Sequence, residues 1–557
     1  EPGKPGTPAA QKGFVSGETI DLPLAATETT EEIPGKRNKE MSPMFHLFKN
    51  LFPAVAMALL LGGCSAAVNW DYPRMPSKAF VHPETTSVGA FFQEAADKHP
   101  GLSGFSLIEH GENAFLTRLA MADLAEKTLD AQYYIWDSDT TGRILVSRLM
   151  RAANRGVRVR ILIDDHYQTE ARDSSVAALD GHPNIEIRFF NPVTNRFWRT
   201  MSFLTDFARV NRRMHNKLLV MDNAVAIVGG RNIADVYFGV REDHNYRDLD
   251  VLTTGPIVQE ISASFDLFWN SDWAIPVGAM VKETPTEKDW KAKLKQFEES
   301  VDAAGYPYPI YQNIDELRAR LVQIRHNFIW ASGHVLVELP DRVETAAEIG
   351  VIHKALSQRV SEVEREVLIE SPYFVLPEPT IEGVRKLTAR GVKVRALTNS
   401  AASSDVIAAH AGYENTREKL LMAGAELYEL RPDTDMERRW SLLAGKSRAS
   451  LHAKSIVFDR KWVFIGSFNL DPRSSTLNTE VGVMIDSPEI AGQVAKIMDA
   501  GVLPGSAYHV TLDQDDRLVW TAENNGEKVQ YDKDPGTNVW ERLLFDLIGS
   551  LPIDHLL

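Results

Sequence analysis

Hydrophobic positions along the chain predict alternating strands and helices. In "LDAQYYIWDSDTTGRILVSRLMRAANRGVRVRILID", a short apolar run typical of a strand is followed by helical spacing, a glycine stop and a second β-rich run. "EVLIESPYFVLPEPTIEGVRKLTARGVKVRALTN" repeats this order. Each segment therefore predicts a strand–helix–strand unit, and we expect an α/β fold whose halves are mostly parallel sheets flanked by helices. The helical positions are Ile144, Leu145, Leu149 and Ala153 before Gly156, and Ile381, Val384 and Leu387 before Gly391.

A second pattern is also present twice. "MHNKLLVMDNAVAIVGGRN" ends at Asn232, and "LHAKSIVFDRKWVFIGSFN" ends at Asn469. A constant offset of 237 residues (452 − 215) aligns the two stretches, which indicates an internal duplication. We therefore predict two halves related by a pseudo-twofold axis, with one site where they meet. The aligned pairs are His215 with His452, Lys217 with Lys454, Asp222 with Asp459, and Asn232 with Asn469.

Each half also supplies an acid after its motif. In "YRDLDVLTTGP", Asp248 lies eight residues before Pro256, and in "LNTEVGVMIDSP", Glu480 lies eight residues before Pro488. Asp250 shares a strand face with Asp248, so the choice between them stays open, although the proline register favours Asp248.

The two-residue period of a strand divides the motif residues between its faces. His215 and Lys217 point the same way, whereas Asp222 faces away from them. Asp222 and Asp459 also fall in turn-like stretches, "MDNA" and "FDRK". Two roles stay open for these aspartates: a direct catalytic role, or a hydrogen bond that braces the strand end.

Two imidazoles, two ammonium groups and two carboxamides suit a phosphodiester. Lysine and asparagine side chains can hold the phosphate oxygens, and the motif glycines let backbone amides approach. One histidine can attack phosphorus while the other protonates the leaving alkoxide and later deprotonates the acceptor. Asp248 and Glu480 can each hold the far nitrogen of a histidine, and we expect Asp248 or Asp250 to orient His215. We predict no metal or other cofactor, because the lysines carry the positive charge.

Composition narrows the classes of function. The 557 residues suffice for two to four globular units, and the net charge of -15 with a pI near 5.5 argues against nucleic-acid binding. Cys64 is the chain's one cysteine, which excludes an internal disulfide and a multi-cysteine metal site. No HExxH motif occurs.

The N-terminal region has the pattern of an exported lipoprotein. The uncharged run from Leu51 to Gly63 is shorter than the ~20 residues of a spanning helix and typical of a signal-peptide core. It ends in "LGGC", which resembles the bacterial lipoprotein cleavage box, with Cys64 as the lipidated residue; the alternative is a buried apolar helix. We expect translation to start at Met41 or Met44. The expected segments are a disordered extension at 1–40, a signal peptide at 41–63, a linker at 64–100, and halves at 101–300 (motif 209–236) and 301–557 (motif 446–473).

The repeated stretches resemble the signature of the phospholipase D superfamily, HxKxxxxD followed after six residues by GSxN. The resemblance covers roughly residues 100–557, with Gly230 in place of the usual serine and Ser467 retained in the second copy. It implies two α/β halves with the active site at their interface. It also implies that His215 is the nucleophile and His452 the acid, roles that the residues alone leave open.

Within this superfamily, "NRRMHNKLLVMDNAVAIVGGRNIADVYF", "RDLDV" and "LPIDHLL" resemble bacterial cardiolipin synthases. The resemblance implies transphosphatidylation through a phosphohistidine, with phosphatidylglycerol or a related phospholipid as substrate. The alternatives are a hydrolytic phospholipase D or other phosphodiesterase, and a non-catalytic lipid-binding lipoprotein. Oligomeric state stays open.

A lipid substrate implies contact with a membrane surface. The aromatic and basic stretch Arg188–His215 suggests an interfacial lip, although a helix packed on the core fits equally well, and "ERRWSLLAGKSRASLH" is a weaker counterpart. With lipidation at Cys64, we expect the periplasmic face of a bacterial envelope, and Ser65 favours the outer membrane.

Overall fold

The computed structural model describes residues 68–551, except residue 169, parts of 197–204 and 304–312, and residues 282–285, 345–347 and 434–447. The chain divides into two units, 1–63 and 64–557, and the first lies outside the described residues. The expected extension, signal peptide and Cys64 lipidation therefore stay predictions. Among the described helices, none has the length and apolar character needed to cross a membrane.

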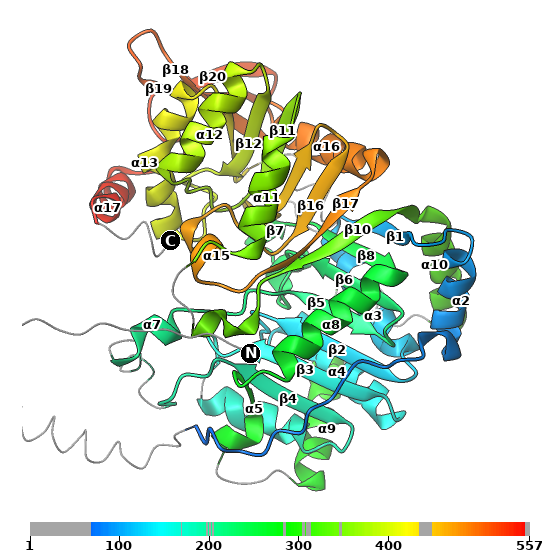
Figure 1. The fold of residues 1–557 in the computed structure, drawn as a ribbon. Helices are drawn as coiled ribbons and strands as arrows, with labels where there is room; N and C mark the ends of the chain where they lie inside the picture. Colours follow the sequence, from blue (N-terminus) through cyan, green and yellow to red (C-terminus); the bar gives the residue numbers. More distant parts are fainter. Residues whose placement is uncertain are drawn as a thin grey trace, which may run out of the picture. The chain divides into compact units, whose positions relative to one another are not determined.

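The first half is a twisted sheet with helices on both faces (Figure 1). Its three central strands are parallel, and the outer strands are antiparallel to their neighbours. The strand order is β1 (Ser103–Ile108), β8 (Asp250–Thr254), β6 (Val225–Gly229), β5 (Leu218–Met221), β2 (Thr128–Tyr133), β3 (Arg158–Asp164), β4 (Ile185–Phe190) and β9 (Ala274–Pro276).

The second half repeats this order strand for strand. It runs β10 (Ile329–Val337), β17 (Val481–Asp486), β16 (Trp462–Gly466), β15 (Ser455–Phe458), β11 (Glu366–Glu370), β12 (Lys393–Asn399), β13 (Glu426–Leu430) and β18 (Ala507–Leu512), and β19 (Leu518–Asn524) and β20 (Glu527–Tyr531) extend it. The start of β10 also pairs with β1, so this strand joins the two sheets. The predicted α/β duplication is confirmed.

Each sheet is mixed, which corrects the mostly parallel arrangement expected from the strand–helix–strand units. Those units supply only the parallel strands β2–β3–β4 and β11–β12–β13. The motif strands β5 and β15 instead turn back through three-residue loops, whose first two residues, Asp222–Asn223 and Asp459–Arg460, have positive φ. Strands joined by so short a turn can only pair antiparallel.

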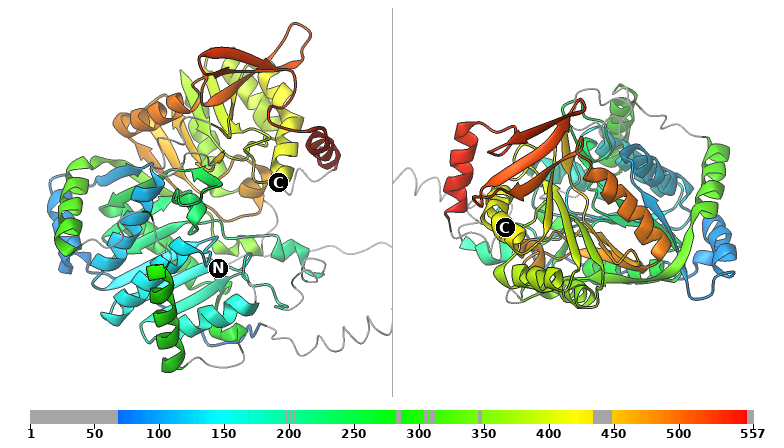
Figure 2. Two further views of the ribbon diagram at one scale, coloured as in Figure 1. Left: turned by 180° about the vertical axis from the view of Figure 1, so that it is seen from behind. Right: turned by 90° about the horizontal axis from the view of Figure 1, so that it is seen from above.

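Helices pack on both faces of each sheet, so that each face is covered by a hydrophobic core (Figure 2). On the outer faces lie α3 (Gly111–Leu124), α4 (Thr140–Asn154) and α5 (Glu170–Asp180) in the first half, and α11 (Val351–Ser361), α12 (Glu378–Ala389) and α13 (Ile407–Met422) in the second. On the inner faces, α8 (Pro256–Trp269) and α16 (Pro488–Gly501) contribute to one hydrophobic core that contains strands of both halves. This shared core holds the two motif hairpins in a fixed relation.

Two expected segment boundaries need correction. The described part of the supposed linker 64–100 contains α2 (Ser87–Ala96), whose Val88 and Phe92 are buried in the first core because they lie on one helical face. Helix α9 (Glu287–Ala303) crosses the expected boundary at residue 300 and packs on α4 and α5, so the first half extends beyond it.

Candidate active site

Backbone pairing between the halves brings the two motifs together. Strand β7 (His244–Arg247) pairs in parallel with β14 (Arg448–Leu451), and Met214 forms a parallel bridge with Thr479. The amide of His215 donates to the Thr479 carbonyl at 2.8 Å, and the amide of His452 donates to the Arg247 carbonyl at 2.7 Å. Since Glu480 follows Thr479 and Asp248 follows Arg247, this register sets each histidine beside the acid of the other half.

The side chains pair across the interface accordingly. Nδ1 of His215 lies 2.9 Å from Oε2 of Glu480, and Nδ1 of His452 lies 2.6 Å from Oδ2 of Asp248. The expectation that Asp248 or Asp250 orients His215 is therefore wrong, because the parallel pairing crosses the halves. Asp250 is instead buried in an ion pair with Arg118 at 2.9 Å.

The two carboxylates have different surroundings. Glu480 accepts hydrogen bonds from the hydroxyls of Ser467 (2.5 Å) and Ser474 (2.8 Å). Although burial raises the pKa of Glu480, His215 and its other partners outweigh burial and hold that pKa below its usual range. For Asp248, which accepts from the amide of Leu249 at 2.8 Å, burial prevails and the pKa is raised. Glu480 is the more firmly ionised partner.

The Gly230 departure from the family signature has a steric cause. A Cβ at this position would lie 2.1 Å from Oδ1 of Asp248, well inside van der Waals contact. At the equivalent place in the second half, Ser467 fits and donates to Glu480. The glycine thus leaves room for the shorter acid on the first half's strand.

Both histidines are held neutral. Burial lowers the pKa of His215 to about 4, and the nearby Lys217 adds to the effect although Glu480 opposes it. Burial, Lys454 and Lys217 lower the pKa of His452 well below its usual range. An ionised carboxylate accepts the proton of Nδ1, so Nε2 of each ring keeps a lone pair available for chemistry.

The two lysines lie beside their histidines, as the two-residue spacing predicts. Nζ of Lys217 donates to the carbonyl of His215 and Nζ of Lys454 to that of His452, each at 2.5 Å. Burial lowers the pKa of Lys454 to about 8 and that of Lys217 well below its usual range, and the charge of Lys454 lowers the pKa of Lys217 further. Two crowded cations favour an arriving anion such as a phosphodiester.

The two asparagines are not equivalent. Asn232 accepts from the amide of Ile135 at 3.0 Å and donates to the hydroxyl of Tyr237 at 2.8 Å, which fixes its carboxamide. Asn469 is buried, and among the described residues its Oδ1 has no hydrogen-bond partner. The Asn469 side chain can therefore reorient toward a substrate at no cost in protein hydrogen bonds at Oδ1.

The motif aspartates brace the strand ends. Asp222 accepts from the amides of Glu126, Lys127 and Thr128 at 2.7–2.9 Å. Asp459 makes the same three contacts to the amides of residues 364–366, at 2.8–3.0 Å. The bracing role is confirmed, and the direct catalytic role is contradicted because the carboxylates turn away from the histidines.

Sequence reasoning missed the aromatic surroundings of the site. The ring of Tyr134 lies 5.1 Å from that of His215, and the rings of Tyr237 and Tyr246 each lie 5.0 Å from that of His452. The Tyr246 hydroxyl donates to Asp405 at 2.6 Å, and that of Tyr373 donates to the same carboxylate at 3.1 Å. Tyr246 lies in β7 and Tyr237 at the end of a short 3-10 helix, positions that carry no sequence signal of a site. Tyr134 directly follows β2, where the carboxyl end of a parallel strand does signal a site.

The expected interfacial lip at Arg188–His215 is largely turned inward where it is described. Arg188 and Arg196 are buried, and Arg196 forms ion pairs with Asp165 (2.6 Å) and Asp173 (2.5 Å). The alternative of packing on the core therefore holds for these basic residues. The weaker counterpart before the second motif falls mainly in residues 434–447, outside the described part.

Several known proteins are similar to this chain. A family model described as "Cardiolipin synthase, PLD-like domain" matches residues 119–269 and 356–501. Cardiolipin synthase C of Escherichia coli (strain K12) is 38% identical over 466 residues, covering 83% of this chain and 97% of that protein. An uncharacterized protein of Helicobacter pylori (strain J99) is 31% identical, covering 90% and 99%. The crystal structure of a Haemophilus influenzae phosphatidylserine synthase aligns with a TM-score of 0.49 at 15% identity, covering 74% of this chain and 91% of that one.

Proposed function

The chain belongs to the cardiolipin synthase, PLD-like family of phosphatidyltransferases, and on that premise we propose that it makes cardiolipin by transferring a phosphatidyl group between two phospholipids. The observation that carries the proposal is the pair of buried histidines, each with Nδ1 held by a carboxylate of the opposite half. Phosphatidylglycerol, or a lipid of related headgroup, serves as donor and acceptor.

In the first step, Nε2 of His215 attacks phosphorus. A P–N bond forms and the P–O bond to the departing headgroup breaks, while His452 gives its Nε2 proton to the leaving alkoxide. The role of His215 follows the family pattern, and its partner Glu480, ionised and held by two hydroxyls, supports it. An ionised acceptor on Nδ1 stabilises the positive charge that the ring acquires.

His452 must carry a proton to act as an acid, although burial and the two lysines favour its neutral form. A bound phosphodiester supplies the change, because its negative charge beside the ring favours the imidazolium. Lys217 and Lys454 stabilise the negative charge of the phosphodiester. That charge in turn favours the cationic form of both lysines, which burial alone disfavours. Substrate binding thus favours the protonated form of His452 and the charged forms of both lysines.

In the second step, the acceptor decides between transfer and hydrolysis. The acceptor hydroxyl gives its proton to Nε2 of the now neutral His452 and attacks phosphorus, and the P–N bond to His215 breaks. A lipid hydroxyl yields cardiolipin, whereas water yields phosphatidic acid, the outcome of the hydrolase alternative. Asp405, fixed by Tyr246 and Tyr373 next to His452, offers an acceptor for the hydrogen bond of an alcohol.

Lipid mass spectrometry of a cardiolipin-deficient bacterial host that expresses the chain tests this function. Cardiolipin should appear with the intact chain and be absent with His215→Ala or His452→Ala. Leu267→Ser, a change of an exposed residue on α8, is the control and should leave cardiolipin present. Accumulation of phosphatidic acid without cardiolipin would replace the transferase by the hydrolase.

We also infer that Cys64 carries a lipid anchor and that the chain works at the periplasmic face of the bacterial envelope. The support is the sequence alone: an uncharged run that ends in "LGGC", with Ser65 favouring the outer membrane. Labelled fatty acid should enter the expressed chain and not its Cys64→Ser variant. Label retained by that variant would overturn the anchor.

A further inference from the structure

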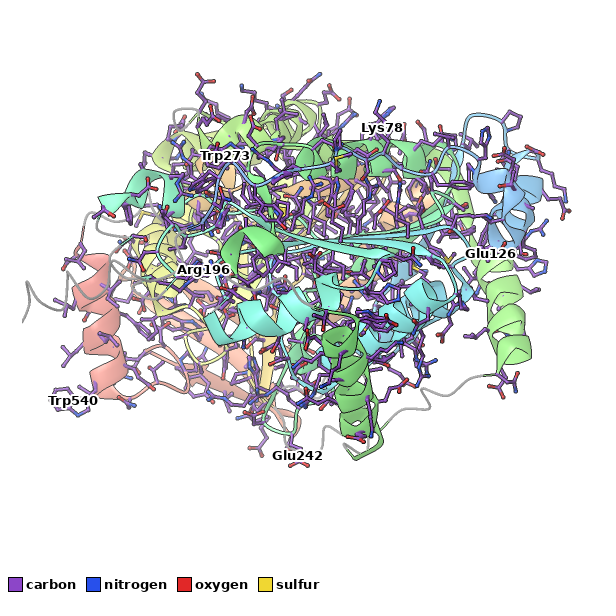
Figure 3. All side chains as sticks on the ribbon, turned by 90° about the horizontal axis from the view of Figure 1, so that it is seen from below. Lys78, Glu126, Arg196, Glu242, Trp273 and Trp540 are labelled. Carbon is purple, nitrogen blue, oxygen red and sulfur yellow. The ribbon has the colours of Figure 1, made fainter. Side chains whose placement is uncertain are left out.

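Helix α17 (Val539–Gly549) turns large apolar side chains to solvent. Trp540 is 80% exposed and stands away from the body of the protein (Figure 3). The exposed residues recur at the three- to four-residue spacing of one helical side. Contiguous apolar surface of this kind marks an interaction site. The other members are Val539 (61%), Leu543 (52%), Leu544 (40%), Leu547 (63%) and, just after the helix, Leu551 (46%).

The helix is well formed, so this exposure is not that of a frayed end. Asn538 and Glu541 make a capping box at its start. On the opposite side Phe545 is buried, with its ring 5.1 Å from that of His410 on α13. Both views of Figure 2 show α17 against the outer side of α13.

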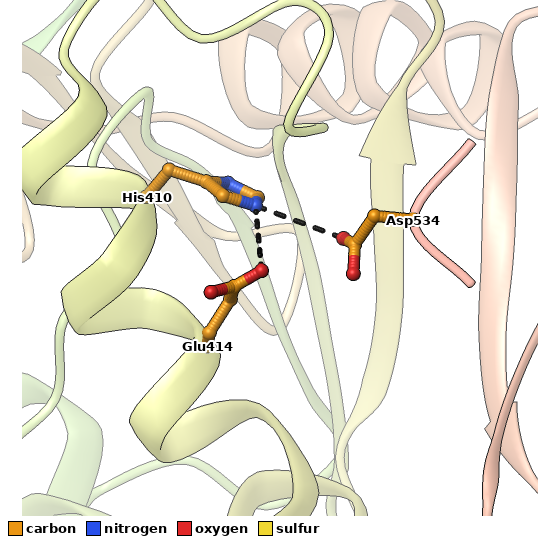
Figure 4. Close-up of side chains that lie close together, drawn as sticks. All are labelled: His410, Glu414 and Asp534. Carbon is orange, nitrogen blue, oxygen red and sulfur yellow. Dashed lines mark ion pairs between the residues drawn. The ribbon is translucent and has the colours of Figure 1, made fainter. Parts of the chain in front are cut away.

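A buried cluster of charges clamps the segment before α17 onto α13. Nε2 of His410 lies 3.5 Å from Glu414 and 3.7 Å from Asp534 (Figure 4). Both oxygens of Asp534 also accept from Arg417, at 2.8 and 3.2 Å, and Arg417 reaches Glu429 at 3.1 Å. His410, Glu414 and Asp534 could otherwise hold a metal ion, but the guanidinium already occupies both oxygens of Asp534. The cluster therefore fixes the segment before α17 to α13.

Helix α13 also connects this charge cluster to the active site. It begins two residues after Asp405, whose carboxylate accepts from Tyr246 beside His452. Val406 and Ile407, at this end of α13, are 39% and 45% exposed. Apolar side chains are thus exposed both next to Asp405, which forms the rim of the active site, and on α17, which packs on α13.

We propose that α17 inserts its apolar face into a phospholipid surface and so holds the active-site rim against the lipid headgroups. The proposal rests on the proposed function, which requires the enzyme to take its substrates from a membrane. Tryptophan at the helix start is the residue favoured at membrane–water interfaces. Within α17, Glu541, Arg542 and Asp546 leave little net charge, and the chain carries -15 overall, so the attraction is hydrophobic and not electrostatic.

Sedimentation with vesicles of phosphatidylethanolamine and phosphatidylglycerol tests the proposal on the full chain carrying Cys64→Ser, which removes any lipid anchor. The chain should bind, and Leu543→Ser with Leu547→Ser should weaken binding by about tenfold for each side chain. Leu267→Ser on α8 is the matched control, since Leu267 is 51% exposed and Leu543 is 52%, and it should leave binding unchanged. Raising the salt concentration should not release the chain.

Three outcomes separate this proposal from others. His215→Ala, which lacks the nucleophile, should still bind vesicles. Loss of membrane binding can therefore be told apart from loss of catalysis. Brominated lipids should quench the fluorescence of Trp540, measured as the difference between the parent chain and Trp540→Phe. The proposal is overturned if the double serine variant binds as the parent does, or if it only converts a dimer into a monomer in light scattering.

Discussion

His215 and His452 occupy equivalent places in the duplication, but their carboxylate partners give them different surroundings. Glu480 is stabilised by two hydroxyls, and Asp248 faces a glycine where the other half has a serine. This asymmetry is built from single side chains and gives the two rings separate tasks. It also makes the effects of substitutions in the two halves unequal.

Replacing Glu480 by Gln should impair the nucleophile. The amide no longer provides the negative charge that fixes the Nδ1 proton of His215 and stabilises the charged ring, so the phosphohistidine should form about a hundredfold more slowly or worse. Rapid-quench measurement of the adduct gives this rate. Asp248→Asn should instead leave more adduct at steady state, because His452 then activates the acceptor poorly; equal adduct levels in both variants would contradict the crossed pairing.

Gly230→Ser should displace Asp248, because its Cβ would lie 2.1 Å from the carboxylate oxygen. We expect a loss of cardiolipin formation by about tenfold or more, a milder effect than removal of His452. Gly492→Ser, at a glycine with open space around its Cβ, is the control and should retain activity. Full activity of Gly230→Ser in a lipid assay would show that the close contact does not matter.

The pH dependence follows from the lowered pKa values. His215, with a pKa of about 4, stays neutral far below the usual histidine range, and Lys454, with a pKa of about 8, loses its charge above that pH. With a p-nitrophenyl phosphatidyl donor, whose leaving group needs no proton, kcat/KM should therefore fall only as pH drops toward about 4 and again above about 8. An acid limb near 6.5 would contradict a buried, neutral His215.

Two strand ends are held by the carboxylates of Asp222 and Asp459, each with three backbone amides and a backbone φ of 52° in the following turn. These hydrogen bonds join the motif hairpin to the neighbouring strand–helix–strand unit. The motif aspartate therefore serves the element that carries the histidine and not the chemistry itself.

Asp222→Ala should destabilise the fold and spare the chemistry. Three amide donors lose their acceptor, that of Thr128 buried and those of Glu126 and Lys127 partly buried, which should cost about 3 kcal/mol in the free energy of unfolding. Urea denaturation measures the loss, and adduct formation on His215 at low temperature should persist. The control is Asp515→Ala, since that side chain is 71% exposed; an Asp222→Ala chain that is stable but inactive would restore a catalytic role.

The repeated elements were predictable from the sequence because periodicity and a constant offset are local signals. These signals predicted the parallel strand pairs that enclose the helices ending before Gly156 and Gly391. They also predicted that His215 and Lys217 lie on one face of their strand. They did not predict the crossed acids, since the pairing of β7 with β14 depends on how the halves pack. The aromatic residues around the histidines were missed for the same reason, and so was α17, whose exposure is visible only once Phe545 is buried.

For the whole molecule, duplication supplies one composite site at the interface of two mixed sheets. Neither half holds a complete catalytic pair, because each histidine takes its carboxylate from the other. A half expressed alone would therefore lack an oriented imidazole. The proposed docking helix α17 belongs to the second half and packs on α13, which begins two residues after Asp405.

The measurement that tests the central claim most directly is peptide mass spectrometry of the covalent intermediate. The chain is mixed with the p-nitrophenyl phosphatidyl donor, quenched and digested. In His452→Ala, which cannot activate the acceptor, the account predicts a phosphatidyl adduct on Nε2 of His215, and in His215→Ala it predicts none. An adduct on His452 in the His215→Ala chain, or no adduct in either variant, would contradict it.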